Sequence, residues 1–425
     1  MNLKVLFNQY FMLEKKNDLG NLSTETKIKT NINKFSRINW KLNDIIHYGF
    51  LSSVIFFVFI IFPSSFLIKI PLLSIFILCF LIPVTSQFFI YALPIFAWLA
   101  LYFSAGKIPV SWKPKILVQV LPIMETILYG DDLSNVLATF TSTWLDLVAW
   151  LPYGIIHFAC PFILAGCIFL FACPTSLRSF AFAFGYMNLF GVIIQLFFPA
   201  APPWYKNIHG LQPANYDMSG SPGGLGRIDK LFGIDMYTTG FSNSPVIFGA
   251  FPSLHSGCAV MEVLFLCWLF PRLKLLWYGY ACWLWWCTMY LTHHYFVDLT
   301  GGALLSLIIF NYTKHTQLPI LDHEKLSRWS YEEIKLPNIH LTDPLNNQFV
   351  LVNDQENQII PPSSNLFEMS NFQSRNKLRL LDEESDNSDS SIVNYSSPSS
   401  VFDEHHQISQ TTSTTSLDEE FNKHR

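Results

Sequence analysis

The amino-acid sequence predicts an all-α protein that crosses a membrane several times. Its 425 residues are 51% hydrophobic and only 14% charged, whereas soluble domains are about 25% charged. Residues 46–314 contain 20 charged side chains and a series of long apolar runs. This composition excludes a soluble enzyme, a coiled coil and a disulfide-stapled secreted module. It also excludes a nucleic-acid-binding protein, because too few basic residues remain to form a basic face.

The charged residues divide the chain into three parts. Residues 1–45 have a net charge of +4, residues 46–314 of +2 and residues 315–425 of −10. We therefore expect a cytosolic N-terminal arm, a transmembrane domain and an acidic cytosolic tail. The tail is rich in Ser, Asn, Asp and Glu, and we expect it to be disordered because it cannot bury enough apolar surface to offset its ordering entropy.

Eight apolar runs in the middle part are expected to form about eight transmembrane helices. They cover residues 46–62, 70–84, 88–104, 153–173, 180–198, 256–270, 275–292 and 297–312. The second and third are short for a hydrocarbon core of about 30 Å, which requires roughly 20 residues. The run at 116–124 is shorter still, so we expect it to lie at the interface or to be buried.

Positive charges orient this bundle. With eight spans, the basic residues that fall on one side are those of the N-terminal arm, Arg178, Arg272, Lys274 and Lys314. The positive-inside rule makes that side cytosolic, together with both termini. The polar loop 199–252 then lies on the lumenal side, and a connection of this length is usually functional.

Two short stretches contain residues suited to catalysis, Phe251–Gly257 and Thr292–Asp298. The first opens one predicted span and the second closes the next, so the hairpin between them brings His255 and His294 to the same membrane face. His294 and Asp298 are spaced i, i+4. A carboxylate there can orient the histidine as a nucleophile, while His255 protonates a leaving group and later deprotonates an acceptor. The combination predicts phosphoryl or phosphodiester transfer through a phosphohistidine.

These stretches resemble the type-2 phosphatidic acid phosphatase superfamily, whose fold has a six-helix transmembrane core. The segment Pro252–His255 is similar to its Pro-Ser-Gly-His motif, with leucine in place of glycine. His294 and Asp298 match the end of its Ser-Arg-x5-His-x3-Asp motif. The resemblance implies a six-helix core within residues 46–314, which would be the catalytic domain.

The resemblance is incomplete where the superfamily binds phosphate. Cys287 and Thr288 replace the Ser-Arg pair, and Lys107 and Lys113 only echo the Lys-x6-Arg-Pro motif. Because the superfamily's arginines hold phosphate oxygens, other cations must supply that charge. Lys107, Lys113 and Arg227 are the candidates on the same predicted face; the alternative for each is a snorkelling or solvated side chain.

Longer segments resemble the catalytic subunits of fungal inositol phosphorylceramide synthases. These segments are residues 120–130, 200–205, 219–229, 249–257 and 290–298. The resemblance implies transfer of phosphoinositol from phosphatidylinositol to ceramide, with His294 as nucleophile, Asp298 orienting it and His255 as acid and base, without a metal or cofactor. It also implies a lumen-facing site in the Golgi membrane, a small membrane regulatory subunit and sensitivity to aureobasidin A.

Two questions stay open at this point. Glu262 lies seven residues after His255, about 10 Å deeper on the same helical face. It either binds an inositol or ceramide hydroxyl or is a protonated packing residue. The alternatives to the transferase are a lipid phosphate phosphatase, which passes the phosphohistidine to water, and a non-enzymatic lipid transporter. The missing arginines argue against the phosphatase, since a phosphodiester needs less counter-charge than a monoester.

Overall fold

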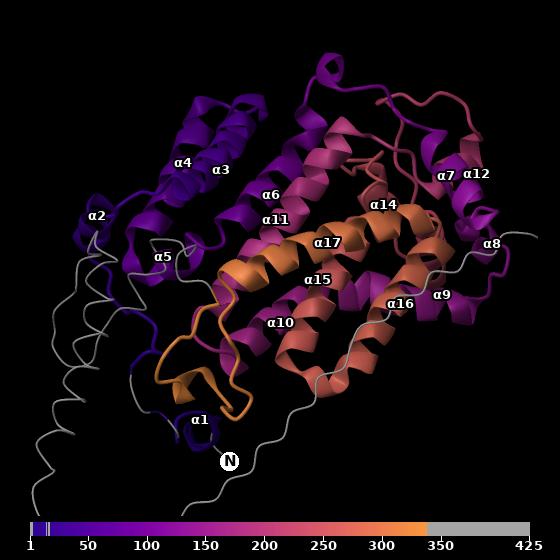
Figure 1. Ribbon diagram of the computed structural model, residues 1–425. Helices are drawn as coiled ribbons and strands as arrows, with labels where there is room; N and C mark the ends of the chain where they lie inside the picture. The colour runs from indigo at the N-terminus through magenta and orange to yellow at the C-terminus, as the bar shows by residue number, and fades with distance from the viewer. Residues whose placement is uncertain (1–2, 14, 16–17, 338–425) are drawn as a thin grey trace, which may run out of the picture. The chain divides into compact units, whose positions relative to one another are not determined.

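The computed structural model describes residues 3–13, 15 and 18–337 of the chain (Figure 1). These residues form helices joined by loops, and within these ranges the only β-type pairings are isolated bridges between Leu117 and Ala200 and between Ala200 and Gly249. The prediction of an all-α architecture is confirmed. The part of the predicted disordered tail from residue 338 onward lies outside the described residues.

Among the described residues, four helices are long and apolar enough to cross a membrane, so the protein is a multi-pass membrane protein. They are α3 (Leu42–Ile61), the continuous helix Thr143–Phe171, α11 (Ser176–Phe197) and α17 (Phe296–Thr316). A fifth span results if α4 (Phe66–Leu81) and α5 (Pro83–Phe89), which meet at an angle of 100°, count as one. Pro83 begins α5, and it interrupts the helical hydrogen bonds because proline has no N–H.

Shorter helices occupy three other predicted spans. α6 (Leu93–Ser104), α15 (Leu254–Leu269) and α16 (Lys274–Tyr290) have 12, 16 and 17 residues. At 1.5 Å per residue they measure about 18–26 Å, less than the hydrocarbon core of about 30 Å. A total of eight spans therefore stays a prediction.

Short elements connect or flank these helices. They are α1 (Leu3–Phe11), α2 (Ile28–Ser36), η1 (Ala105–Lys107), η2 (Val110–Trp112), α7 (Val120–Tyr129), α8 (Leu133–Ala138), α12 (Pro203–His209), α13 (Leu225–Phe232), α14 (Met236–Ser242), η4 (Pro271–Leu273) and η5 (Arg328–Ser330). The helix Thr143–Phe171 consists of α9 (Thr143–Trp150), a π-helical segment (Leu151–Ile156) and α10 (His157–Phe171). α7, with ten residues, overlaps the run that was expected to be too short to cross.

α11 forms the centre of the core. It packs against α6, α10, α15 and α17 (Figure 1). In its most apolar stretch of 18 residues, 67% of the residues are buried. Gly185 permits the close approach to α6, because a Cβ atom there would lie only 2.6 Å from the backbone nitrogen of Ile95. By contrast, α4 has no buried residue, as expected for an apolar helix at the periphery that faces lipid.

The chain after α17 differs from the prediction that disorder begins at residue 315. α17 continues to Thr316, and the side chains of Leu318, Trp329 and Tyr331 are buried. The Trp329 ring packs edge-on against Phe7 of α1, with ring centroids 5.2 Å apart. A few apolar residues in an otherwise polar segment are enough to hold it against the N-terminal arm, so the boundary of the predicted tail moves beyond Tyr331.

Candidate active site

The first turns of α15 and α17 bring three predicted catalytic residues together. His255 lies in the first turn of α15, His294 in the connection before α17, and Asp298 in the first turn of α17. His255 Nδ1 lies 3.0 Å from His294 Nε2, and His294 Nδ1 lies 3.3 Å from Asp298 Oδ1. The hairpin topology predicts this meeting of residues that are 39 positions apart in the sequence.

The surroundings of Asp298 orient His294. The side chains of His294 and Asp298 are 7% and 0% exposed, and Asp298 Oδ2 accepts a hydrogen bond from the backbone N–H of Tyr295. Among the described residues, neither Asp298 Oδ1 nor His294 Nδ1 has an aligned hydrogen-bond partner, although they are within ion-pair distance. A carboxylate beside Nδ1 favours the Nδ1–H tautomer, which leaves the Nε2 lone pair directed at His255.

Backbone contacts fix α15 against α17. The N–H of Ser253 donates to the carbonyl of Asp298 over 3.0 Å, and the hydroxyl of Ser256 donates to the carbonyl of Leu299 over 2.6 Å. Gly302 has no room for a side chain, because a Cβ atom would collide with the carbonyl oxygen of Ser253. His255 and Asp298 therefore lie on two helices, α15 and α17, whose first turns cannot move apart without breaking these hydrogen bonds.

Glu125 of α7 is a site residue that sequence reasoning missed. Its two carboxylate oxygens each accept a hydrogen bond of 3.1 Å, from the backbone N–H groups of Phe296 and Val297. It thereby satisfies two of the donors that the start of α17 leaves free. Burial raises the pKa of Glu125, and these two N–H groups offset part of that rise. The available signal was a single acid in the apolar sequence Val120–Leu128.

Tyr153 forms an aromatic wall of the site. Its ring stacks on His255 and on His293, with centroid distances of 4.6 Å and 5.3 Å. Burial, together with nearby His294, lowers the pKa of His293 to about 3. His293 is therefore neutral, and its Nε2–H donates to the carbonyl of Pro222 over 3.1 Å. It supports the loop that contains Pro222.

The π-helical segment brings Tyr153 and His157 to the histidines. The His157 ring lies 4.8 Å from the His255 ring. Among the described residues, the Tyr153 hydroxyl and His157 Nδ1 are buried without a hydrogen-bond partner. Gly154 is required here, since a Cβ atom would lie 2.5 Å from the Tyr237 hydroxyl. Widened turns of this kind are frequent at functional sites.

Comparisons with known proteins identify the family of this chain. A family profile described as the PAP2 superfamily matches residues 124–312. The inositol phosphorylceramide synthase of Candida albicans is 61% identical over 385 residues, which cover 86% of this chain and 82% of that protein. The chain belongs to the inositol phosphorylceramide synthase family.

Other fungal members of the family give the same result. The catalytic subunit of the inositol phosphorylceramide synthase of Saccharomyces cerevisiae is 54% identical, with 80% of this chain and 85% of that protein covered. The corresponding subunit of Schizosaccharomyces pombe is 47% identical, with 75% and 77% covered. No solved structure matches the chain significantly. The protein is thus a phosphotransferase of a family that acts in sphingolipid synthesis.

In this synthase-family chain, Arg227 is held by an acid near the histidines. Its Nε and Nη2 atoms donate to both carboxylate oxygens of Asp146 over 2.6–3.0 Å, and the Tyr290 hydroxyl donates to the same carboxylate over 2.8 Å. Burial alone would lower the pKa of the Arg227 guanidinium, but Asp146 raises it. The Gly224 N–H donates to the carbonyl of Leu291 over 2.9 Å, so the glycine-rich loop before Arg227 lies on the connection that carries His294.

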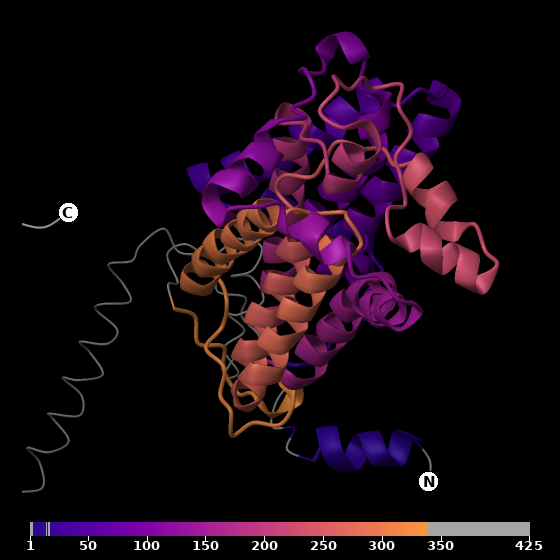
Figure 2. The ribbon, with the colours of Figure 1, turned by 90° about the vertical axis from the view of Figure 1, so that its right-hand side faces the viewer.

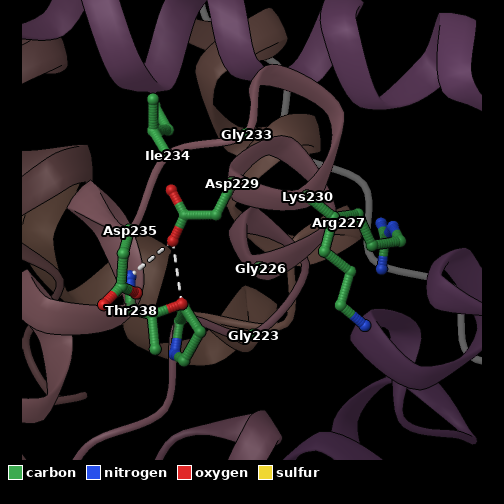
Figure 3. A pocket seen from close by; sticks show the side chains of 10 residues that line it. Gly223, Gly226, Arg227, Asp229, Lys230, Gly233, Ile234, Asp235 and Thr238 are labelled. Atoms are coloured by element: carbon green, nitrogen blue, oxygen red, sulfur yellow. Dashed lines mark hydrogen bonds between the residues drawn. The ribbon is translucent and has the colours of Figure 1, made fainter.

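A pocket of about 510 Å³ lies between α13 and α14 (Figure 3). Arg227 and Lys230 line it, but Figure 3 shows them extending away from Asp229, which points toward Thr238. Burial would raise the pKa of Asp229, but hydrogen bonds from the Thr238 N–H, the Thr238 hydroxyl and the Tyr237 N–H lower it below its ordinary value. The carboxylate is therefore engaged in holding α14.

The other predicted headgroup residues lie apart from the histidines. Lys107 ends η1, and Lys113 Nζ lies 4.9 Å from the centre of the Tyr216 ring. Glu262 is fully buried, and its Oε2 accepts a hydrogen bond from the Tyr280 hydroxyl over 3.2 Å. Within the described part of the chain, no hydrogen bond, ion pair or ring contact joins these three residues to His255 or His294. In the same part, no group of His, Cys, Asp and Glu side chains is arranged to hold a metal ion.

Proposed function

We propose that the enzyme transfers phosphoinositol from phosphatidylinositol to ceramide, giving inositol phosphorylceramide and diacylglycerol. One observation carries this proposal, the line of ring nitrogens and carboxylate formed by His255, His294 and Asp298, with separations of 3.0 Å and 3.3 Å. It combines a nucleophile, an orienting acid and a second histidine able to carry one proton. The family relationship supports the identity of donor and acceptor.

In the first step, His294 Nε2 attacks the phosphorus of phosphatidylinositol. The N–P bond forms, the bond between phosphorus and the glycerol oxygen breaks, and His255 Nδ1 gives its proton to that oxygen. Diacylglycerol leaves, and the growing positive charge on the His294 ring is stabilised by Asp298. Phosphorus must come between two nitrogens that are 3.0 Å apart in the free enzyme, so the two rings separate when the donor binds.

In the second step, ceramide reverses the proton movement. Its primary hydroxyl attacks phosphorus, His255 takes the hydroxyl proton, and the N–P bond breaks. Both histidines then return to their starting states. This symmetry explains why a transferase needs His255 to be neutral between the steps and protonated at Nδ1 before the first.

Cations near the site are proposed to hold the phosphate. Arg227 is the leading candidate, because the Gly223–Gly224 turn before it touches the connection that carries His294. Lys107 and Lys113 are proposed to act at longer range on the headgroup. Glu262, with Tyr280 as its partner, is proposed to accept a hydrogen bond from a hydroxyl of inositol or ceramide.

We propose that the histidines face the Golgi lumen. Basic residues at the opposite ends of the same helices support this orientation, since Arg272 follows the end of α15 and Lys314 lies in the last turn of α17. The arm of residues 1–45 and the tail would then be cytosolic, and the loop 199–252 lumenal. We further propose a small membrane regulatory subunit as partner and sensitivity to aureobasidin A. Two relatives are named as catalytic subunits, which supports the first of these proposals.

A reconstitution tests the proposal. Purified protein in detergent receives phosphatidylinositol with or without a fluorescent ceramide, as wild type, as His294→Ala and as His315→Ala. His315 lies exposed in the last turn of α17, so its replacement is the matched control. We expect a ceramide-dependent fluorescent product from wild type and control, and a loss on the order of 10⁴-fold in His294→Ala.

Other outcomes would assign a different activity. Release of water-soluble inositol phosphate without ceramide would indicate a lipid phosphatase-type hydrolase. Lipid movement across vesicles that persists in His294→Ala would indicate a transporter. If wild type alone forms no product, a membrane extract is added, and a product that then appears indicates a missing regulatory subunit.

A further inference from the structure

The hairpin of α13 and α14 has an apolar tip that the rest of the described chain leaves uncovered. Leu231, Phe232, Ile234 and Met236 are 46%, 48%, 43% and 57% exposed. The turn between them is made by Gly233 in the left-handed conformation, φ 66°. Figure 2 shows this hairpin projecting from the side of the helix bundle. Four large apolar side chains in six positions are more than an ordinary aqueous loop presents.

The hairpin is rigidly built, so the exposure of its tip is a fixed feature. Asp229 of α13 accepts hydrogen bonds from the backbone N–H groups of Tyr237 and Thr238, over 3.1 Å and 2.7 Å. Trp150 Nε1 donates to the Tyr237 hydroxyl over 2.6 Å. These bonds tie both helices to each other and to the helix Thr143–Phe171.

The depth of the tip follows from its neighbour on that helix. The Phe232 ring lies 5.2 Å from the Trp150 ring. The 29 residues of Thr143–Phe171 measure about 44 Å, some 14 Å more than the hydrocarbon core. This helix begins at Thr143, which is its end on the histidine side. Trp150 lies seven residues, or about 10 Å, from that end. The tip therefore lies beside a spanning helix close to the edge of the hydrocarbon.

The neighbouring surface is also apolar. Leu151 and Ile155, which follow Trp150 on the spanning helix, are exposed, and Phe232 packs against Trp150 itself. Two polar residues set the limit of insertion. Lys230 is exposed at the base of the tip, where an ammonium group can meet lipid phosphates. Asp235 accepts a hydrogen bond from the Thr239 hydroxyl over 3.0 Å. One oxygen of its carboxylate is therefore already paired where the hairpin would meet the lipid headgroups.

We propose that the tip formed by residues 231–236 inserts into the bilayer leaflet on the histidine side, as an interfacial anchor whose partner is lipid. Small amphipathic elements of this kind bury their apolar face at the boundary between headgroups and acyl chains. The base of the same hairpin carries Arg227 and contacts the His293 loop through Gly223. The role of this anchor rests on the proposed function. The anchor holds Arg227, which is proposed to bind the phosphate, at the depth of the phosphodiester of phosphatidylinositol.

Fluorescence quenching in vesicles tests this insertion. The full chain is reconstituted in phosphatidylcholine vesicles with a dansyl amino acid in place of Phe232, or in place of Asp217 as a control. Asp217 is exposed in the same loop. Vesicles contain either phosphatidylcholine brominated on its acyl chains or iodide on both sides of the membrane. At position 232 we expect brominated lipid to remove about half of the fluorescence and iodide to have little effect, with the reverse at position 217.

The readout does not depend on turnover, so it stands even if the proposed reaction is wrong. Position 236 provides a second probe in case the replacement of Phe232 prevents folding. Iodide quenching at both 232 and 236 as strong as at 217 would place the tip in water and overturn the proposal. Quenching by neither reagent at both positions would indicate a protein partner over the tip, and would overturn it as well.

Discussion

The two ends of the helix bundle both bury charge, but they treat it differently. At the end opposite the histidines, Arg328 is only 8% exposed. Its Nε donates to the carbonyl of Gly20 over 3.0 Å, and its guanidinium lies 4.1 Å from the centre of the Phe169 ring. At the histidine end, His294 Nδ1, Asp298 Oδ1 and the Tyr153 hydroxyl are buried without an aligned partner among the described residues.

This difference separates a structural end from the end at which the proposed reaction takes place. A buried polar atom without a partner costs about 1–3 kcal/mol. The hydroxyls of Thr175 and Ser176 at the Arg328 end are also buried without a partner among the described residues, but they are not acids or bases, whereas His294 and Asp298 are. Arg328 ties the segment after α17 to the N-terminal arm, and no part of its side chain has a role in the proposed reaction. The histidine end holds its rings through backbone contacts and leaves their nitrogen atoms available. Substitutions at the two ends should therefore affect different properties, turnover at one and stability at the other.

After His294→Ala, the largest effect is expected from Asp298→Asn. The amide nitrogen of asparagine can donate to His294 Nδ1, which favours the wrong tautomer and puts the proton on the attacking Nε2. We expect turnover to fall on the order of 10³-fold with little change in folding. Ceramide-dependent product formation measures this, with thermal unfolding in detergent as the folding check. Exposed Asp217→Asn is the matched control, and equal activity of both variants would contradict the role of Asp298.

A smaller effect is expected from Arg227→Ala, about 10–100-fold in kcat/KM for phosphatidylinositol. The ion pair with Asp146 makes a double-mutant cycle necessary. If Arg227 also contacts the donor phosphate, its removal from the Asp146→Asn variant should still cost about tenfold. If the double variant is no worse than Asp146→Asn alone, Arg227 serves only to hold α13 to α9, and the phosphate-binding proposal for it is wrong.

Glu125→Gln should lower turnover by about tenfold, because glutamine keeps only one acceptor oxygen for the N–H groups of Phe296 and Val297. The pH profile distinguishes this role from general destabilisation. Burial raises the pKa of Glu125, so its carboxylate becomes protonated as the pH falls through a value higher than that of an ordinary glutamate. Wild type should lose activity there, whereas Glu125→Gln should lack that acidic step. An unchanged acidic limb would count against Glu125 as a positioning residue.

The residues that sequence reasoning found share one property, local topology. His255 and His294 lie at the two ends of one hairpin, and Asp298 is one helical turn from His294, so their meeting follows from the order of the spans. Glu125 contacts amides that are 171 and 172 residues away, and Asp146 pairs with Arg227 across 81 residues. Such contacts depend on how helices pack, which periodicity and composition do not report.

The elements follow the same division. Long apolar runs such as α11 and α17 were predictable within a few residues, because a spanning helix needs length and little else. The hairpin α13–α14 was not, since its apolar residues are too few to stand out in a loop rich in glycine and proline. The packed segment that contains Trp329 was missed for a similar reason. Its burial comes from aromatic contacts with the distant Phe7.

The smallest effect on turnover is expected from Arg328→Gln, at the structural end. Burial lowers the pKa of Arg328 to about 10, so the guanidinium is charged at neutral pH. Its replacement removes a charge-assisted hydrogen bond to Gly20 and a cation–π contact with Phe169, worth about 1–3 kcal/mol together. Thermal unfolding in detergent should shift down by a few degrees, while kcat changes by less than about twofold. Exposed Arg272→Gln should change neither, and a tenfold loss of kcat in folded Arg328→Gln would show that the two ends are coupled rather than separate.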